Sequence, residues 1–132
     1  MVYKHIVMWK FKEQHNGKSA LENARWMKEQ LEGLVGVVPE LLSAEVGISP
    51  ALEQAAGAPA PVAAQSNAAA PSNAAAVPAP AASGEYDACL LSTFASPEAL
   101  AAYKVHPKHK AISAYCKEAR LKRLAFDWWS EE

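Results

Sequence analysis

The sequence predicts a single α+β domain with the element order β-α-β-β-α-β and a four-stranded antiparallel sheet. The first segment alternates between two faces with the period of a strand, and two later segments open with helix-start signals at Ser19 and Ser96. The strand-like segments are residues 2–12, 41–48, 86–95 and 120–129. A chain of 132 residues has the length of one domain, so residues 1–132 are expected to share one core.

The first strand predicts a sheet that needs cover on both faces. One face carries Tyr3, His5, Val7, Trp9 and Phe11, and the other carries Val2, Ile6 and Met8 among lysines. A face that is partly apolar is buried against something in a stable fold. We expect helices to cover the first face and another subunit to cover the second.

The first helix is predicted to begin at Ser19. Ser19 and Glu22 have the spacing of a capping box, in which each side chain bonds the other residue's backbone amide. Met27, Leu31 and Leu34 then recur at helical spacing. Gly33, Gly36 and Pro39 are expected to end this helix.

Residues 51–83, between the second and third strands, have the composition of an insert. They contain sixteen alanines, five prolines and one charged residue, Glu53. Frequent prolines interrupt the helix that alanine favours, and no large side chain is present to be buried. We expect a disordered or polyproline-like segment that acts as a linker or as a partner-binding arm.

The third strand, residues 86–95, is almost continuously apolar, which is typical of a central strand. Ser96 and Pro97 then form a helix start, as N-cap and first helical residue. Pro107 disfavours helix at His106, so we expect a break there and a second helical piece over 107–118 before the last strand. This order is the split βαβ, or ferredoxin-like, plan with both helices on one face.

Composition excludes several classes of partner. The net charge is −1, which provides no field for nucleic acid or an anionic membrane, and no run of about 20 apolar residues is present. Cys89 and Cys116 have neither the pattern of a disulfide framework nor that of a redox motif. We expect a cytoplasmic protein that does not bind nucleic acid or membranes.

Four segments resemble the stress-responsive A/B barrel (Dabb) domains. They are Lys4–Lys12, the pair Glu85–Ala88 and Phe94–Leu100, the motif Tyr103-x-x-His106-Pro107-x-His109, and Phe126–Trp128. The resemblance implies a ferredoxin-like subunit that forms a homodimer through its sheet face, closing a dimeric α/β barrel. It does not imply one activity, since the family includes plant stress-induced proteins and a plant polyketide cyclase. The alanine-proline insert departs from the compact hairpin usual in the family.

The candidate catalytic residues are His5, Tyr103 and His109. Resemblance to the cyclase implies that His109 is a general base, that Tyr103 hydrogen-bonds a substrate carbonyl, and that His5 assists. The cyclase has a further tyrosine on its first helix, where this chain has Trp26 as the nearest large aromatic residue. We expect Val7, Trp9, Trp26 and His106 to line a ligand pocket.

A structural reading of the same residues stays open. A buried His5 bonded to Tyr103 or His109 would hold the second helix on the sheet, and His106 would then be a cap at the helix break. No third ligand accompanies His106 and His109 in the sequence, so we expect no metal. No glycine-rich phosphate loop is present either, so we expect no nucleotide cofactor.

Three functions remain open at this point. The first is a homodimeric Dabb-type protein of unassigned activity that binds a small apolar or aromatic molecule or acts in a stress response. The second is a cofactor-independent cyclase, lyase or monooxygenase-like enzyme that uses His109 as its base. The third is a scaffold that uses residues 51–83 as a docking arm.

Overall fold

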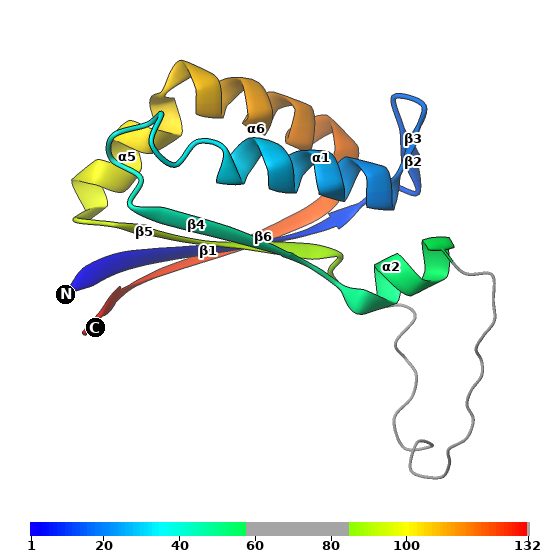
Figure 1. The fold of residues 1–132 in the computed structure, drawn as a ribbon, viewed down its shortest axis with the longest axis horizontal. Helices are drawn as coiled ribbons and strands as arrows, with labels where there is room; N and C mark the ends of the chain where they lie inside the picture. The colour runs from blue at the N-terminus through cyan, green and yellow to red at the C-terminus, as the bar shows by residue number, and fades with distance from the viewer. Residues whose placement is uncertain (58–84, 132) are drawn as a thin grey trace, which may run out of the picture.

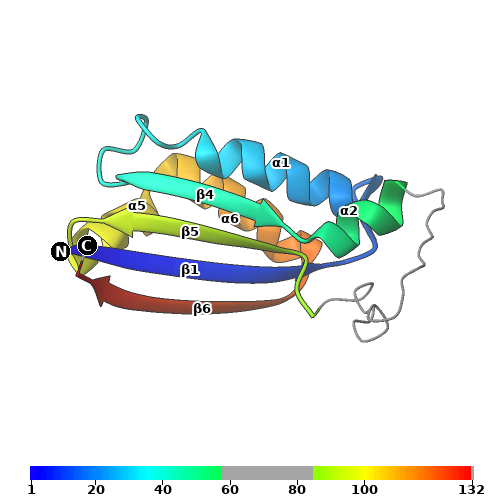
Figure 2. The same ribbon diagram turned by 60° about the horizontal axis from the view of Figure 1, so that its bottom comes forward.

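The protein folds as one layer of helices on one four-stranded antiparallel sheet (Figure 1). The computed structural model describes residues 1–57 and 85–131. The sheet has the order β4-β5-β1-β6, with β1 at Val2–Phe11, β4 at Ser43–Ile48, β5 at Ala88–Phe94 and β6 at Arg120–Ser130. Figure 2 shows the four strands side by side in this order. The predicted α+β, ferredoxin-like fold is confirmed.

Alternation along β1 sets which face of the sheet forms the core. Val7, Trp9 and Phe11 are buried beneath the helices, and His5 is buried on the same face. Strands β1 and β5 are the two central strands, as the apolar character of residues 86–95 predicted. Because cross-strand partners point to the same face, Ile6 and its partners Leu91 and Phe126 lie on the face opposite the layer formed by α1, α5 and α6.

Helix α1, Ala20–Glu32, begins with the predicted capping box. The Glu22 amide donates to Ser19 Oγ at 3.1 Å, and the Ser19 amide donates to Glu22 Oε1 at 2.9 Å. The helix ends at Gly33, as expected, and buries Met27 and Leu31 against the sheet.

Side chains at the C-terminal end of α1 form hydrogen bonds with the backbone of the edge strand β4. Lys28 Nζ donates to the Val46 carbonyl at 2.8 Å, and the Val46 amide donates to Glu32 Oε2 at 2.9 Å. The hydrogen bond from Lys28, followed by that from the Val46 amide, lowers the pKa of the Glu32 carboxyl below its usual value. These contacts occupy backbone groups that an open sheet edge would present to another chain.

Two helices follow β5, separated by the predicted break at His106. Helix α5 spans Pro97–Val105 and α6 spans Pro107–Ala119. His106 has extended backbone angles, as expected of a residue before proline, and its Nδ1 accepts the Lys108 amide at 3.1 Å. The expectation that His106 caps the break is therefore confirmed.

The start of the predicted insert is a helix. Helix α2 spans Pro50–Gly57, so the expectation of disorder is wrong for its first residues. Ser49 Oγ accepts the Ala51 amide at 3.2 Å and Pro50 occupies the first helical position, while no proline interrupts the next seven residues. The prediction for residues 58–83 lies outside the described residues.

A short hairpin was not predicted. Strands β2, Gln14–His15, and β3, Lys18–Ser19, pair through Asn16 and Gly17, both of which have positive φ angles of 59° and 75°. An Asn-Gly pair favours this tight turn because both residues tolerate positive φ. The turn signal was present in the sequence, but residues 14–19 lack the alternating apolar pattern that marks a longer strand.

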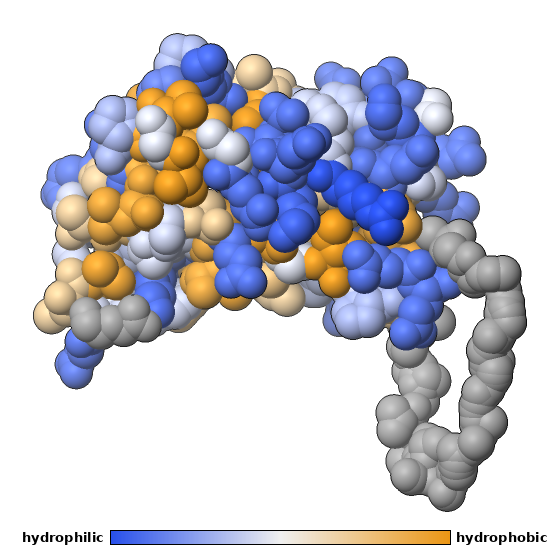
Figure 3. All heavy atoms as spheres, viewed as in Figure 1, coloured by the Kyte–Doolittle hydropathy of each residue, from blue (hydrophilic) through white to orange (hydrophobic). Residues whose placement is uncertain are grey.

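The ends of the molecule have different surroundings. Both termini lie at one end of the sheet and α2 lies at the other, so the insert leaves the fold far from the end that begins β1 (Figures 1 and 2). Hydrophilic residues cover much of the visible helix layer around α1, and apolar residues gather at the α5 end (Figure 3). Among the described residues, no helix combines the length and apolar character needed to span a membrane.

Candidate functional site

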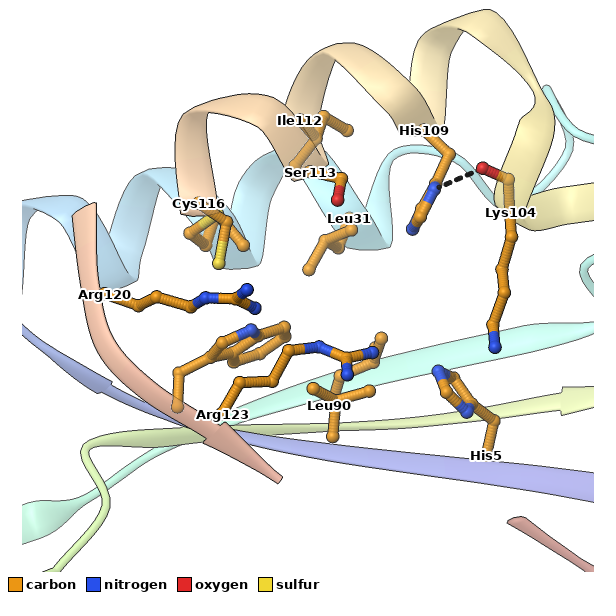
Figure 4. Close-up of a pocket in the computed structure, with 13 residues that line it drawn as sticks. His5, Leu31, Leu90, Lys104, His109, Ile112, Ser113, Cys116, Arg120 and Arg123 are labelled. Atoms are coloured by element: carbon orange, nitrogen blue, oxygen red, sulfur yellow. Dashed lines mark hydrogen bonds between the residues drawn. The ribbon is translucent and has the colours of Figure 1, made fainter. Parts of the chain in front are cut away.

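A pocket of about 280 Å³ opens between α6 and the helix-facing side of the sheet (Figure 4). Its apolar walls come from the sheet, α1 and α6, and consist of Val7, Trp9, Met27, Leu31, Leu90, Ile112 and Cys116. Its polar lining consists of His5, Lys104, His109, Ser113, Arg120 and Arg123. The pocket thus combines an apolar interior with ionisable groups from β1, α5, α6 and β6.

His5 is fixed by a partner on the neighbouring strand. The register of β1 and β6 places His5 directly opposite Asp127, and His5 Nδ1 lies 2.5 Å from Asp127 Oδ1. A carboxylate oxygen accepts, so Nδ1 carries the proton and Nε2 of the neutral ring keeps its lone pair. Burial lowers the pKa of His5, and this effect exceeds the opposing effect of Asp127.

His109 is held in the same tautomer by the preceding helix. Its Nδ1 lies 3.2 Å from the Lys104 carbonyl oxygen, which can only accept a hydrogen bond. Burial lowers the pKa of His109, although the bond to Lys104 opposes this, and His5 and the Arg123 cation lower it further. Figure 4 shows the His109 ring extending from α6 into the pocket. The ring is therefore neutral at neutral pH, with Nε2 available as a base.

Tyr103 lies behind His109 rather than in the pocket lining. Its side chain is fully buried, and its ring centroid lies 4.3 Å from that of His109 and 5.1 Å from that of Phe94. Within the described part of the chain its hydroxyl has no hydrogen-bond partner. Burial raises the pKa of Tyr103, so the hydroxyl keeps its proton and remains a donor.

The structural reading assigned the wrong hydrogen-bond partners to His5 and His109. His5 bonds Asp127 and His109 bonds Lys104, so neither forms the expected hydrogen bond to the other or to Tyr103. Asp127 is the hydrogen-bond partner of His5, and the sequence did not identify this pair. This pairing needs the β1–β6 register, which residue spacing alone does not give.

Two of the four residues expected to line the pocket do so. Val7 and Trp9 form part of its wall. Trp26 instead packs on Tyr115 of α6, with ring centroids 4.6 Å apart, because it precedes Met27 and turns away from the sheet. His106 does not line the pocket because its ring caps α6.

Sequence reasoning missed the basic residues of the pocket, Lys104, Arg120 and Arg123. Alternation along the last strand contained a signal, since Arg123 shares a face with Asp127 and therefore with His5. The sequence indicated for Cys116 neither a disulfide framework nor a redox motif. It lines the pocket, and burial raises its pKa to about 11, which keeps it protonated at neutral pH.

The two histidines of the motif do not converge on a shared point. His106 uses Nδ1 to cap α6, and His109 uses Nδ1 on the Lys104 carbonyl. In residues 1–57 and 85–131, no group of three histidine, cysteine or acidic side chains is arranged to hold a metal ion.

The sequence profile of the stress-responsive A/B barrel domain matches residues 3–63 and 74–130. The chain belongs to this family. The match confirms the resemblance carried by the four sequence segments, and between its two parts it leaves out only residues 64–73 of the alanine-proline stretch. No curated protein matches the chain.

Solved structures show the same fold. A dimeric protein of unknown function from Bacteroides fragilis is 19% identical, with a TM-score of 0.66 over 98% of this chain and 96% of that one. A Dabb family protein from Mesorhizobium loti is 14% identical, with a TM-score of 0.58 over 99% and 98%. A hydroxynitrile lyase from Passiflora edulis is 16% identical, with a TM-score of 0.62 over 99% and 95%. These structures support the ferredoxin-like fold.

Proposed function

We propose that the pocket binds a small carbonyl compound and that His109 acts there as the general base of a cofactor-independent reaction. One observation carries this proposal. The bond from His109 Nδ1 to the Lys104 carbonyl leaves Nε2 unprotonated in a pocket that His5 also lines. A base positioned in this way contributes roughly 10²–10⁴-fold to the rate of proton transfer.

The charged side chains around His109 can stabilise the negative charge that forms on the ligand when it loses a proton. When His109 Nε2 removes a proton, negative charge develops on an oxygen of the ligand. Lys104 and Arg123 line the same pocket and can stabilise that charge. The second imidazole, His5, is held by Asp127 with its Nε2 unprotonated, and can accept a hydrogen bond from the ligand. The buried Tyr103 hydroxyl is a further donor without an acceptor in the described residues, behind the His109 ring.

Cleavage of a hydroxynitrile is one reaction that needs only these groups. The base takes the hydroxyl proton, the carbon–cyanide bond breaks, and the carbonyl forms as cyanide leaves with the electron pair. Cyanide then takes a proton from the imidazolium, which returns the base to its neutral state. The similar fold of the Passiflora enzyme motivates this choice, and an aldol closure needs the same proton transfers.

Turnover by a His109→Gln variant tests the proposal. Release of cyanide from aromatic hydroxynitriles, and closure of short polyketide analogues, would be followed with wild-type protein and the variant. We expect the variant to lose about 10²-fold or more in kcat, because glutamine cannot accept the proton. His106→Gln is the matched control, since His106 lies outside the pocket, and it should keep full activity.

The alternative function is ligand binding without chemistry. The apolar wall around Trp9 favours it, because such a wall binds small molecules whether or not a reaction follows. Activity that is the same in wild-type and His109→Gln protein would contradict the enzymatic proposal. Retained binding of an aromatic ligand, followed by tryptophan fluorescence, would then favour the binding protein.

We also propose that the chain is a homodimer through the uncovered face of its sheet, closing an α/β barrel. An apolar patch on that face supports this, and consists of Ile6, Met8, Leu91, Leu124, Phe126 and Trp128. Phe126 is 65% exposed in the single chain and Leu124 is 52% exposed. Contiguous apolar surface of this kind is typical of an interface, and several similar structures are described as dimeric.

We place the protein in the cytoplasm. Cys89 and Cys116 are free thiols on separate elements, as expected in a reducing compartment. Fractionation of cells that express a tagged chain tests this, and recovery outside the cytoplasm would contradict it. A docking role for residues 51–83 remains a prediction.

A further inference from the structure

We infer that the ligand of the pocket is an organic acid. Its carboxylate would contact the basic rim, formed by Lys104, Arg120 and Arg123, and its apolar body would lie against the apolar inner wall. The inference rests on the pocket being the functional site proposed above, but not on chemistry at His109. It narrows the expected small apolar or aromatic molecule to one that carries a negative charge.

The first argument is the one-sided charge of the pocket. Lys104, Arg120 and Arg123 line it, and no aspartate or glutamate does so. Within the described residues, none of the three forms an ion pair with a carboxylate. Residues 58–84 contain no charged side chain, so that segment cannot supply a countercharge.

The second argument is how the three cations are arranged. Lys104 comes from the end of α5, Arg120 from the junction of α6 with β6, and Arg123 from β6 itself. Figure 4 shows the two guanidinium groups extending over the pocket from one side and the Lys104 amine descending toward His5 from the other. Arginine fits a carboxylate well, because its planar fork can donate two parallel hydrogen bonds.

The carboxylate that bonds His5 is already partnered. Asp127 lies beside the pocket, but its Oδ1 bonds His5 Nδ1. The two imidazoles carry no negative charge in either protonation state, so they cannot neutralise the arginines. A bound anionic ligand is therefore the group that would balance the positive charge of the rim.

The third argument separates an organic acid from a free inorganic anion. Most of the inner wall is formed by Leu31, Leu90 and Ile112, which offer no hydrogen bonds to the remaining oxygens of a phosphate, and Trp9 adds an aromatic surface with a single indole N–H donor. A pocket of about 280 Å³ has room for a ring or a short chain in addition to a carboxylate. An amphipathic acid satisfies both the rim and the wall.

Calorimetric titration of the full chain tests the inference. The probes are benzoate and phenylacetate, their neutral amides benzamide and phenylacetamide, and inorganic phosphate. We expect at least one acid to bind about tenfold or more tightly than its amide, and more tightly than phosphate. Equal affinity for acid and amide, binding of phosphate as tight as that of the acids, or no binding of either acid at millimolar concentration would overturn the inference.

Variants assign the effect to the rim. Arg120→Gln and Arg123→Gln should each weaken binding of the acid by about three- to tenfold and leave that of the amide unchanged. Arg123→Lys keeps the charge and should lose less than Arg123→Gln. Lys110→Gln, on α6 but outside the pocket, is the control and should bind as wild type. Unchanged binding of the acid by both glutamine variants, with their folding verified by thermal melting, would contradict the inference.

This experiment can fail separately from the proposed function. His109→Gln should still bind the acid, because its role is in proton transfer. Loss of the preference for acids, with turnover that still depends on His109, would overturn this inference alone. Loss of His109-dependent turnover, with the preference retained, would overturn the catalytic proposal alone.

Discussion

At the scale of single residues, the two pocket imidazoles differ from a solvated histidine in what each Nδ1 contacts. Asp127 accepts a hydrogen bond from His5 Nδ1, and the Lys104 carbonyl accepts one from His109 Nδ1. Each neutral ring therefore keeps a lone pair on Nε2. The sequence indicated His5 and His109 as candidate site residues, because one stands on an alternating strand and the other in a recognisable motif, and both line the pocket. It could not indicate these partners, since one depends on strand register and the other on the helix break at His106.

The lowered pKa values of His5 and His109 predict that stability falls in mild acid. Both pKa values lie below the ordinary 6.5 in the folded state, so the unfolded chain binds more protons as the pH falls through that range. The free energy of unfolding should therefore be highest above about pH 7 and decrease as the pH falls through 6.5 toward the folded-state values.

Chemical denaturation between pH 5 and 8, monitored by circular dichroism, measures this dependence. A variant with His5→Gln and His109→Gln should show a smaller slope over the same range. His15→Gln, on the β2–β3 hairpin and outside the pocket, is the control substitution. A wild-type slope equal to that of the double variant would contradict the assignment of two buried neutral imidazoles.

At the scale of elements, local signals predicted the regular pieces well. The Ser19 capping box, the Ser96 start and the Pro107 break each depend on a few neighbouring residues, and each lies where expected. Helix α2 was missed because the composition of the whole insert outweighed the start signal at Ser49 and Pro50. The contact between Asp87 and Phe11 joins residues far apart in sequence, and no local pattern reveals it.

Asp87 joins β1, β5 and the start of α2. Its buried carboxylate accepts the Phe11 amide at 2.9 Å and Lys10 Nζ at 3.2 Å, where the β1–β6 register shifts. Its amide donates to the Trp9 carbonyl at 2.7 Å, and its carbonyl accepts the Ser49 amide at 2.8 Å. The irregularity between Lys10 and Phe11 is therefore held by a side chain that immediately precedes β5.

Replacing Asp87 by alanine should lower the free energy of unfolding by about 1–3 kcal/mol, because the Phe11 amide would be left buried without an acceptor. Urea denaturation measures the change. Glu85→Ala is the control, since its ion pair with Lys122 is exposed and should contribute less than about 1 kcal/mol. Equal effects of the two substitutions would contradict the role of Asp87.

At the scale of the whole molecule, the two faces of the sheet have different tasks. The helix-facing side forms the core and the pocket, and the other side carries the apolar patch proposed as the dimer interface. The sequence predicted this division because Ile6 and Met8 gave the second face of β1 an apolar character. It could not predict the contribution of β6, whose Leu124 and Phe126 join the patch only in the observed register.

Replacing Phe126 by lysine should dissociate the dimer, because a charge would be buried at the centre of the proposed interface. Sedimentation velocity at micromolar concentration should show a dimer for the wild type and a monomer for the variant. Val105→Lys is the matched control: Val105 is 66% exposed and Phe126 is 65% exposed, but Val105 lies on α5. A wild-type monomer, or a dimer unaffected by Phe126→Lys, would contradict the proposed interface.

The protonation of the pocket imidazoles tests the central claim most directly. Long-range ¹H–¹⁵N correlation spectra of uniformly labelled protein at pH 7, assigned with His5→Gln and His109→Gln, report which ring nitrogen of each histidine carries the proton. We predict that both rings are neutral, protonated at Nδ1 and unprotonated at Nε2. A charged His109 ring, or one protonated at Nε2, would contradict its role as the base in this pocket.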